Sequence, residues 1–443
     1  MAEVRPTELP PLAGRRVLVA GAGVTGRSVA AALAAMDARV TVTDANPDRL
    51  AELRSLDVEL VAGLEVPPEG TGMVVTSPGW RPSAPLLRSA AASGVPVLGE
   101  VELAWRIGQR LEHPPAWLAV TGTNGKTTTV GMLEAIMRAA GVPAVACGNV
   151  GLPVLDAVRG GYAVLAVELS SFQLHWSSSL YPAAATVLNV AEDHIDWHGS
   201  MVEYAAAKAK VYANPAGGVY NADDTWSARL GARHGVLASF TLAEPAPWQW
   251  GILHGWLVDR ATDPDGMELV DTAQICPAGQ HNVANALAAA ALARTHGVPA
   301  EAVRNGLRAF QPGAHRSVLI AEAAGVKYVD DSKATNPHAA AGSLRAYGSV
   351  VWIAGGLLKG ASVDELVLGV ADRLRGVVLL GTDALVIAAA LARHAPDVPV
   401  TMVSPGDDGV MIAAVRSASA MAVSGDVVLL APAAASMDQF RDY

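Results

Sequence analysis

A glycine-rich segment between an apolar run and a helical pattern constrains this chain more than any other feature. Apolar residues 117–120 lead into Gly-Thr-Asn-Gly-Lys-Thr-Thr at residues 122–128, and a helical pattern follows to about residue 140. In Walker-type loops of this kind, backbone amides at a helix N-terminus cradle phosphates, a lysine reaches the terminal phosphates, and a hydroxyl ligates magnesium. The segment therefore predicts a domain with parallel strands that binds ATP and Mg²⁺.

The loop departs from the usual Walker spacing at one position. The standard pattern places a glycine five residues before Gly125, but this chain has Val120 there and its first glycine is Gly122. A glycine-rich turn that binds nothing is the alternative, although such a turn has no need for Gly-Lys-Thr-Thr in series. The predicted ATP-binding residues of this loop are Gly122, Thr123, Asn124, Gly125, Lys126, Thr127 and Thr128.

A second glycine-rich turn follows an apolar run near the N-terminus. Residues 17–20 precede Gly-Ala-Gly-Val-Thr-Gly at residues 21–26, and Asp44 ends the next strand candidate 18 residues later. This arrangement fits a dinucleotide-binding fingerprint, although a lone match is a weak signal. Taken alone it predicts NAD binding, but the same geometry can hold any diphosphate at a helix N-terminus.

Strand candidates alternate with helices through three blocks of the chain, which indicates parallel sheets covered by helices. The segment at residues 109–115, with two prolines, and Gln-Pro-Gly-Ala at residues 311–314 separate the blocks. We expect an α/β protein with mostly parallel sheets and three domains. These are a Rossmann-like domain at residues 1–110, a P-loop ATPase-like domain at residues 111–312 and a Rossmann-like domain at residues 313–443. The strand candidates are residues 17–20, 39–43, 73–76, 95–98, 117–120, 162–168, 184–190, 327–330, 349–354, 376–380 and 427–430.

The bulk composition argues against several classes of protein. The chain is 51% hydrophobic and 17% charged, as is typical of a globular protein. A net charge of -10 without a Lys/Arg cluster argues against nucleic acid as a partner. Two cysteines far apart predict neither disulfides nor a cysteine metal site. Because we find no signal segment and no apolar run of the ~20 residues that a membrane span needs, we expect a cytoplasmic protein without a membrane partner.

The shortened loop, read from Thr121 as Thr-Gly-Thr-Asn-Gly-Lys-Thr-Thr, resembles the ATP loop of the Mur ligases, a group that includes folylpolyglutamate synthases. These ligases have three domains, and the resemblance runs nearly end to end. Within the group, the chain is similar to the branch that adds D-glutamate to UDP-N-acetylmuramoyl-L-alanine. The resemblance implies a monomeric, ATP-dependent ligase that activates the alanyl carboxylate as an acyl phosphate during cytoplasmic peptidoglycan precursor synthesis.

The resemblance also implies two magnesium ions beside the ATP loop. Glu168 opens Glu-Leu-Ser-Ser-Phe-Gln-Leu, which is similar to the family's metal motif, and His194 lies in a segment that supplies a histidine near the second magnesium. The family has a lysine that carries CO2 as a carbamate, and Lys208 matches it better than Lys210, although a surface lysine is the default interpretation. The implied metal ligands are Thr127, Glu168, His194 and carbamylated Lys208, and the implied catalytic residues are Lys126, His194 and Lys208.

In this family the first glycine turn belongs to the UDP part of the substrate. Ser77 lies in a Ser-Pro-Gly sequence that resembles a family turn beside the same ligand, although an ordinary turn is the alternative. Asn149 lies in Gly-Asn-Val-Gly, where the resemblance places it near the reacting end of the substrate. The implied UDP-substrate residues are Val24, Thr25, Asp44, Ser77 and Asn149.

Three motifs of the resemblance concern ATP and the incoming amino acid. His-Asn-Val-Ala-Asn at residues 281–285 resembles a motif on the nucleotide side, although the asparagines could instead cap a helix. His-Arg at residues 315–316 implies contact with ATP, and Asp-Ser-Lys-Ala-Thr-Asn at residues 331–336 resembles the D-glutamate-adding branch. The implied ATP contacts are Asn282, Arg316 and Asp331, and the implied glutamate-binding residues are Lys333, Thr335, Lys359, Ser436, Met437 and Tyr443. Tyr443 would form an aromatic lid, and the relatives continue for about one more helix.

Several alternatives stay open. An NAD-dependent oxidoreductase fits the first block but leaves residues 122–128 and Glu168 unexplained. A folylpolyglutamate synthase-like enzyme fits the first block and residues 331–336 poorly, and an L-glutamate-adding ligase differs only in pocket geometry that sequence does not specify. A nucleotide-binding regulatory module without catalysis is the remaining possibility.

Overall fold

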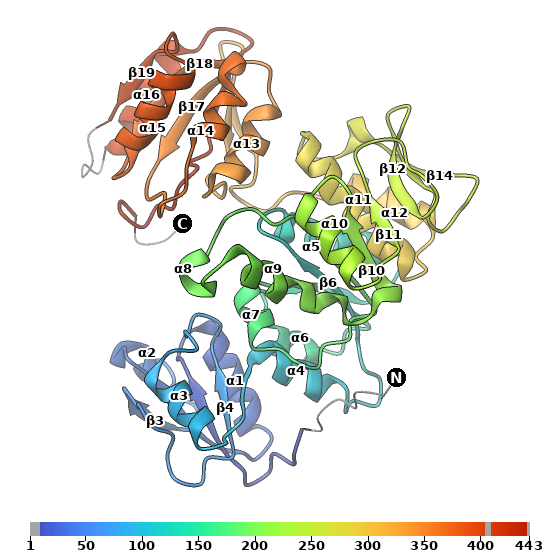
Figure 1. The fold of residues 1–443 in the computed structure, drawn as a ribbon, viewed down its shortest axis with the longest axis vertical. Helices are drawn as coiled ribbons and strands as arrows, with labels where there is room; N and C mark the ends of the chain where they lie inside the picture. The colour runs from blue at the N-terminus through green and yellow to red at the C-terminus, as the bar shows by residue number, and fades with distance from the viewer. Residues whose placement is uncertain (1–8, 404–408, 441–443) are drawn as a thin grey trace. The chain divides into compact units, whose positions relative to one another are not determined.

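The computed structural model describes residues 9–403 and 409–440, which form three sheets flanked by helices (Figure 1). The chain divides into two compact units, the first built mainly from residues up to Gly306 and the second mainly from Leu307 onwards. The first unit contains two of the sheets and the second unit contains the third. The predicted α/β class with mostly parallel sheets is confirmed.

The first sheet has strand order β3-β2-β1-β4-β5 and is parallel throughout. The order reverses between β1 and β4, which creates a crevice at the carboxyl ends of these strands where ligands of such folds bind. The strands are β1 (Arg16–Ala20), β2 (Arg39–Asp44), β3 (Glu59–Ala62), β4 (Met73–Thr76) and β5 (Val97–Gly99). The helices are α1 (Val24–Ala34), α2 (Pro47–Ala51), α3 (Pro85–Ala92) and α4 (Glu100–Gly108).

The second sheet has the order β14-β13-β12-β11-β10-β9-β6-β8-β7, in which β6, the strand before the ATP loop, lies between β9 and β8. Along the sheet from β7 through β8, β6, β9, β10 and β11 to β12, every neighbouring pair of strands is parallel. Strand β12 pairs antiparallel with β13. The strands are β6 (Ala116–Thr121), β7 (Ala144–Gly148), β8 (Val164–Glu168), β9 (Ala184–Val187), β10 (Gly218–Asn221), β11 (Ala238–Phe240), β12 (Gln249–Leu253), β13 (Trp256–Asp259) and β14 (Met267–Asp271). The helices between β6 and the third sheet are α5 (Lys126–Ala139), α6 (Val154–Arg159), α7 (Ser171–His175), α8 (Ile195–His198), α9 (Met201–Ala209), α10 (Thr225–Arg233), α11 (Gln280–Thr295) and α12 (Ala300–Ala309).

The third sheet has the order β15-β16-β20-β17-β18-β19, and only β15 runs antiparallel to its neighbour. Alternate residues of β17 face opposite layers: Trp352 packs with α13, α14 and α15, whereas Val351 and Ile353 pack with α16. The strands are β15 (Val318–Ala323), β16 (Val326–Asp330), β17 (Val350–Gly355), β18 (Leu374–Leu380), β19 (Val400–Met402) and β20 (Val427–Leu430). The helices are α13 (Pro337–Arg345), α14 (Asp364–Leu368), α15 (Ala384–His394) and α16 (Val410–Met421).

Most predicted strands are present, with corrected ends. The strand predicted at residues 184–190 stops at Val187, because the backbone of Leu188 and Asn189 hydrogen-bonds to Thr121 and Thr123 instead of extending the sheet beyond Val187. The sequence analysis missed β3, β7, β19 and all strands from β10 to β15, which are mostly short and lack a clear period-two pattern.

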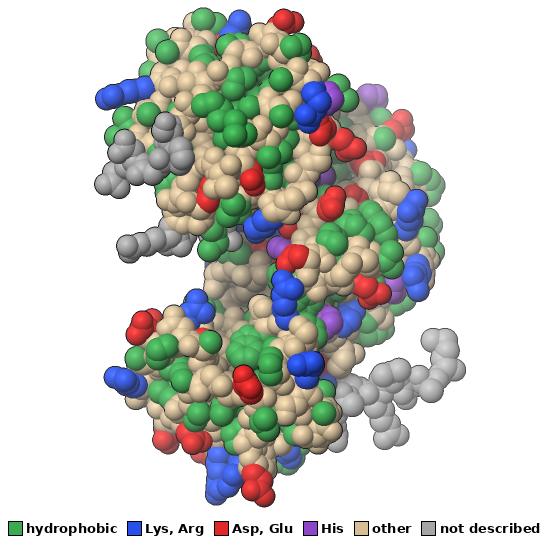
Figure 2. Space-filling view, turned by 60° about the vertical axis from the view of Figure 1, so that its left-hand side comes forward, with side chains coloured by type: hydrophobic (Ala, Val, Ile, Leu, Met, Phe, Trp, Pro, Cys, Tyr) green, Lys and Arg blue, Asp and Glu red, His purple; other side chains and the backbone are tan. Residues whose placement is uncertain are grey.

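The surface of the described residues adds two observations. Figure 2 shows one face on which Lys and Arg side chains are interspersed with Asp and Glu and form no continuous basic area. Within residues 9–403 and 409–440, no helix combines the length and the apolar character needed to cross a bilayer.

In the first unit, helix α6 packs against α4 and α1 and joins the first two sheets. The carboxylate of Glu100, the first residue of α4, is buried there and accepts a hydrogen bond of 2.7 Å from the backbone N–H of Leu155. In α6, next to Leu155, Asp156 accepts a hydrogen bond of 2.8 Å from the hydroxyl of Ser28 in α1. Burial raises the pKa of Glu100 from 4.5 to about 7.

The raised pKa of Glu100 predicts a pH dependence of stability. The folded protein holds the proton more tightly than the unfolded chain, so stability is full below about pH 4.5 and is lost as the pH rises through about 7. The contribution is roughly 3 kcal/mol. Glu100→Gln cannot ionise, so its melting temperature relative to the parent should increase between pH 5 and pH 8 in thermal unfolding. A difference that does not change with pH would contradict this assignment.

Candidate active site

The predicted ATP loop connects β6 to α5 and needs glycine at two positions. Gly122 has φ +155° and Gly125 has φ +86°, and a Cβ on Gly122 would lie only 3.0 Å from the Cβ of Leu188. Val120, which stands where a longer Walker loop has glycine, is buried inside β6. Because β6 continues to Thr121, the loop is shorter than the standard one and needs no glycine at residue 120.

Asn189, which follows β9, clasps the backbone of the loop. Its side-chain oxygen accepts a hydrogen bond of 2.9 Å from the N–H of Asn124, and its amide nitrogen donates one of 3.1 Å to the carbonyl of Asn124. The backbone carbonyl of Asn189 also accepts a hydrogen bond of 3.0 Å from the N–H of Thr123. Asn189 therefore fixes the shape of the loop, a role that the sequence analysis did not identify.

Two lysines converge on the carbonyl oxygen of Gly122. The Nζ of Lys126 donates to this oxygen at 3.0 Å and to the carbonyl of Thr123 at 2.9 Å, while the Nζ of Lys208 donates to it at 2.8 Å. Lys208 is 2% exposed and lies 4.5 Å from the centroid of the Tyr204 ring. The default interpretation of Lys208 as a surface lysine is wrong, because α9 directs its side chain into the interior.

Lys210 has a different environment from Lys208. Its Nζ donates to the carbonyls of Leu174, His175 and Ser177 at 2.8, 2.8 and 2.9 Å, at the end of α7. Burial lowers the pKa of Lys210. These three bonds hold Lys210 against the end of α7 and not against the ATP loop.

The carboxylate of Glu168, at the end of β8, meets two other predicted site residues. One oxygen accepts a hydrogen bond of 2.7 Å from the hydroxyl of Thr127, and the other accepts one of 3.0 Å from the side-chain amide of Asn149. The backbone N–H of Asn149 also donates to the carbonyl of Glu168 at 2.9 Å. Gly148 has φ +122° and no room for a Cβ against this carbonyl, so the approach requires glycine.

These oxygen donors fit Mg²⁺, which prefers carboxylates, hydroxyls and phosphates and keeps several waters. In the part of the chain that the structure describes, no three His, Cys, Asp or Glu side chains gather into a metal cluster. Among these oxygen donors, the hydroxyl of Thr127 and the carboxylate of Glu168 could serve as protein ligands of Mg²⁺.

His194 lies at the start of α8 with φ +55°, in a cluster of aromatic rings. Its ring is 4.7 Å from that of Phe172 and 6.3 Å from that of Tyr204. The Tyr204 hydroxyl is 3.0 Å from the hydroxyl of Thr123 in the ATP loop, and the Tyr204 ring also faces Lys208. Tyr204 thus connects three predicted site residues, although no motif in the sequence analysis identified it.

His198 belongs to the same cluster. It stacks on Phe172 at 5.6 Å and hydrogen-bonds with the hydroxyl of Ser171 at 2.9 Å. Burial, with the nearby His175 and Lys208, lowers the pKa of His198 to about 4. The ring is therefore neutral at pH 7 and packs against the site without adding charge.

The residues predicted for the UDP substrate surround the turn between β1 and α1, apart from Asn149. Asp44 accepts hydrogen bonds from the N–H groups of Ala22 at 2.8 Å and Asn46 at 2.9 Å, so it organises this turn. The hydroxyl of Ser77, after β4, is buried without a hydrogen-bond partner among the described residues. A Cβ on Gly21 would collide with this hydroxyl. Val24 and Thr25 form the first turn of α1 beside them.

In the second unit, the residues predicted for glutamate follow strand ends at the carboxyl edge of the third sheet. Lys333 and Thr335 follow β16, the exposed Lys359 follows β17, and Ser436 and Met437 follow β20. Backbone hydrogen bonds join these three loops. The N–H of residue 433 donates to the carbonyl of residue 334 at 2.9 Å, and residues 357 and 435 each donate their N–H to the carbonyl of the other. Tyr443 lies outside the described residues.

Asp331 is buried at the same edge. It accepts a hydrogen bond of 3.0 Å from the N–H of Ser317 and another from the hydroxyl of Ser343. Burial raises the pKa of Asp331, whereas the adjacent Arg316 opposes this increase. The positive charge of Arg316 thus favours the ionised form of Asp331, as do the hydrogen bonds from Ser343 and Ser317.

Asn282 and Asn285 do not cap a helix, because α11 begins earlier, at Gln280. The side chain of Asn285 donates to that of Asn282 at 3.2 Å, and Asn282 donates to the carbonyl of Ala278 at 3.2 Å. Both side chains are buried. The capping interpretation is therefore wrong for these two residues.

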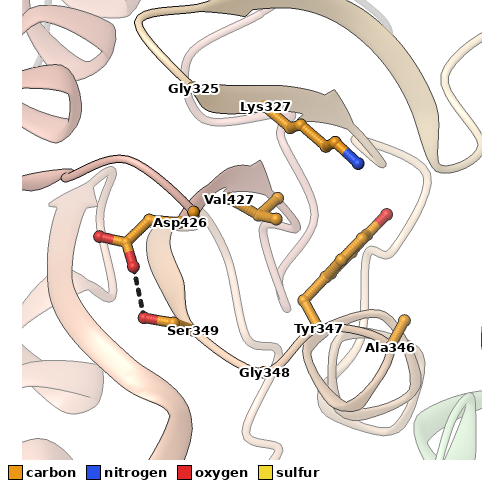
Figure 3. A pocket seen from close by; sticks show the side chains of 9 residues that line it. Gly325, Lys327, Ala346, Tyr347, Gly348, Ser349, Asp426 and Val427 are labelled. Carbon is orange, nitrogen blue, oxygen red and sulfur yellow. Dashed lines mark hydrogen bonds between the residues drawn. The ribbon is translucent and has the colours of Figure 1, made fainter.

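A cavity of about 560 Å³ opens at the opposite, amino edge of the third sheet (Figure 3). The side chains of Lys327 and Tyr347 point toward one another across it, and Ser349 donates a hydrogen bond of 2.6 Å to Asp426 on its other side. None of the predicted site residues lines this cavity.

Known proteins match this chain over nearly its whole length. Residues 15–99 match the MurD-like N-terminal domain of Mur ligases, and residues 120–293 match the Mur ligase middle domain. The chain is 54% identical to the UDP-N-acetylmuramoylalanine–D-glutamate ligase of Streptomyces avermitilis, over 97% of this chain and 96% of that protein. The enzyme of the same name from Thermobifida fusca is also 54% identical, over 98% and 96% of the two chains.

Two solved structures show the same fold at low sequence identity. The UDP-N-acetylmuramate–alanine ligase MurC of Thermotoga maritima has a TM-score of 0.57 at 18% identity, covering 95% of this chain and 96% of that one. MurF of Acinetobacter baumannii has a TM-score of 0.59 at 18% identity, covering 94% and 90%. At these identities the likeness concerns the fold alone.

The Asn189 clasp predicts an isosteric test of ATP binding. Asn189→Asp keeps the acceptor for the Asn124 N–H but places a carboxylate oxygen against the Asn124 carbonyl, which distorts the loop. We expect ATP affinity, measured by calorimetry, to fall about tenfold, equivalent to about 1.4 kcal/mol. Asn214→Asp is the matched control, since Asn214 makes a similar bond to the carbonyl of Pro182 away from the loop. Parent-like affinity in Asn189→Asp would refute the role of the clasp.

Proposed function

Because the chain belongs to the Mur ligase family, we propose that it joins D-glutamate to the alanyl carboxylate of UDP-N-acetylmuramoyl-L-alanine at the expense of ATP. The product is an intermediate of peptidoglycan synthesis. The choice of substrates rests on one observation: relatives with this named activity are 54% identical over nearly the whole chain. We also propose that the enzyme acts in the cytoplasm as a monomer.

The ATP step uses the loop between β6 and α5. The amides at the start of α5 and the ammonium of Lys126 would bind the phosphates, in a loop held by Asn189. Thr127 and Glu168, which already contact each other, would hold Mg²⁺, with Asn282, Arg316 and Asp331 as further nucleotide contacts. The ion would offset the negative charge that develops on the transferred phosphoryl group.

The chemistry proceeds in two steps. An oxygen of the alanyl carboxylate attacks the terminal phosphorus of ATP, and the bond to ADP breaks to give an acyl phosphate. The unprotonated amine of D-glutamate then attacks the acyl carbon, and the resulting tetrahedral species expels phosphate as the amide forms. Lys126 stabilises charge in the first step because it lies where the phosphates would bind.

We propose that Lys208 carries CO2 as a carbamate and, with His194, holds a second Mg²⁺. Support comes from its burial and from Lys126, whose ammonium shares the carbonyl of Gly122 with it. Two cations so close repel each other, and converting one to an anion replaces repulsion by attraction. The ammonium first loses a proton, the resulting amine nitrogen adds to the carbon of CO2, and a second proton leaves as the carbamate forms. Lys210 is a poor candidate because three carbonyls of the α7 region already hold it.

The two substrates would bind at separate strand edges. Val24, Thr25, Asp44 and Ser77 would bind the UDP part, and Asn149 would approach the reacting end. This is supported by the switch point between β1 and β4 and by the unpartnered hydroxyl of Ser77. D-Glutamate has two carboxylates, for which cations and hydroxyls are suitable partners. The residues proposed to bind it are Lys333, Thr335, Lys359, Ser436, Met437 and Tyr443.

The other functions are less well supported. An NAD-dependent oxidoreductase rested on the first glycine turn, but residues 15–99 match the MurD-like N-terminal domain. A sister ligase for another amino acid, including a folylpolyglutamate synthase, is disfavoured by the near-complete match to enzymes named for D-glutamate.

The activity is tested by phosphate release from ATP with UDP-N-acetylmuramoyl-L-alanine and a panel of amino acids. We expect release only when both the UDP substrate and D-glutamate are present, and at most weak release with L-glutamate, D-aspartate or D-alanine. Release that did not require both substrates, or that preferred another amino acid, would contradict the proposed function.

The carbamate is tested by comparing two neighbouring lysines. Lys208→Ala should lose about 100-fold or more in kcat, equivalent to roughly 3 kcal/mol, because it removes a metal ligand. Added formate or acetate should restore part of this activity by replacing the carbamate oxygens. Lys210→Ala is the control: we expect a lower melting temperature without rescue by carboxylates. A fully active Lys208→Ala, or an inactive one that carboxylates do not rescue, would refute the carbamate.

A further inference from the structure

The loop that carries Asn149, residues 148–153, is held at both ends by glutamates. At one end, Asn149 contacts Glu168 through its backbone N–H and through its side-chain amide, at 2.9 and 3.0 Å. At the other end the loop enters α6, where the carboxylate of Glu100 accepts the N–H of Leu155 at 2.7 Å. Between these ends, the N–H of Gly148 donates to the carbonyl of residue 152 at 2.9 Å and closes the loop on itself.

A glutamate at residue 100 is energetically unfavourable in this environment. It lies 2% exposed among the apolar side chains of α4 and α6, where an ionised carboxylate costs free energy unless hydrogen bonds compensate. Packing alone would be served by an apolar side chain of similar size. What the carboxylate adds is an acceptor at the first turn of α6, where the backbone N–H groups have no partner within the helix.

Helix α6 also contacts the helix of the first glycine turn. Asp156, next to Leu155, accepts the hydroxyl of Ser28, and Ser28 lies one turn after Thr25 in α1. The position of the Asn149 loop and the contact with α1 therefore both depend on the first turn of α6. This contact does not involve Glu100, so the two ties can be tested separately.

We propose that Glu100 is a positioning residue whose carboxylate fixes the first turn of α6 and thereby sets Asn149 beside Glu168. The inference rests on the proposed function, in which Glu168 holds Mg²⁺ and Asn149 approaches the reacting end of the UDP substrate. Glu100 touches neither substrate nor metal. Its effect passes through a loop of six residues.

The test compares Glu100→Ala, Glu100→Gln and Ser28→Ala in the full-length enzyme. Glu100→Ala removes the acceptor, so we expect the KM for UDP-N-acetylmuramoyl-L-alanine and the Mg²⁺ concentration for half-maximal rate to rise about tenfold. The KM for D-glutamate should stay within about twofold, because its proposed residues belong to the other unit. Glu100→Gln keeps an acceptor oxygen and should restore both values. Ser28→Ala, which breaks only the tie to α1, should resemble the parent.

A second variant covers the case in which Glu100→Ala does not fold. Glu100→Asp keeps a carboxyl group but is too short to reach the N–H of Leu155, so it should show the same selective rise in KM. Hydrogen exchange should also show lower protection of residues 148–155 in both variants. Unchanged KM and Mg²⁺ dependence, or equal effects on the KM of all three substrates, would overturn the proposal. If the parent itself released no phosphate with these substrates, the proposed function would fail instead.

Discussion

The carbonyl oxygen of Gly122 is the point on which the candidate ATP site depends. It accepts hydrogen bonds from Lys126 at 3.0 Å and from Lys208 at 2.8 Å. One loop oxygen therefore connects Lys126, which is proposed to bind phosphate, with a buried lysine from α9. Gly122 can present this oxygen because it adopts a φ open to glycine and sits against Leu188. Around it, the clasp by Asn189 keeps the loop in shape. The close pair of cations gives a physical reason why a carbamate on Lys208 would stabilise the site.

The predicted site residues follow one structural rule in all three sheets. In each sheet most of the predicted site residues lie at the carboxyl ends of parallel strands: β1, β2 and β4 in the first, β6, β7, β8 and β9 in the second, and β16, β17 and β20 in the third. Ligands of doubly wound folds bind at this edge because loops and helix N-termini converge there. The first unit would hold the UDP substrate, the phosphates and the metal, whereas the second unit would hold glutamate. Such a division suits a reaction in which an activated carboxylate must meet an amine and not water.

The fold class could be predicted from the sequence, because glycine turns after apolar runs have strict local requirements. The same motifs named Thr127, Glu168 and Asn149, which the structure brings into contact. The sequence did not predict that Lys208 is buried, since helical periodicity alone does not show which face of α9 packs inward. It also missed Asn189 and Tyr204, whose bonds to the ATP loop span 65 and 81 residues and follow from sheet order, which no local pattern contains. The antiparallel strands β13 and β15 were missed because they belong to no strand–helix alternation.

Activation of the alanyl carboxylate as an acyl phosphate is the step on which the proposed reaction depends. It is tested most directly by preparing UDP-N-acetylmuramoyl-L-alanine with ¹⁸O in the alanyl carboxylate and analysing the released phosphate by mass spectrometry. If the carboxylate attacks ATP and D-glutamate then displaces phosphate, each phosphate must carry one oxygen from the labelled carboxylate. Phosphate without label, formed at the same rate as the amide product, would contradict the acyl phosphate and with it the role assigned to the loop at Gly122.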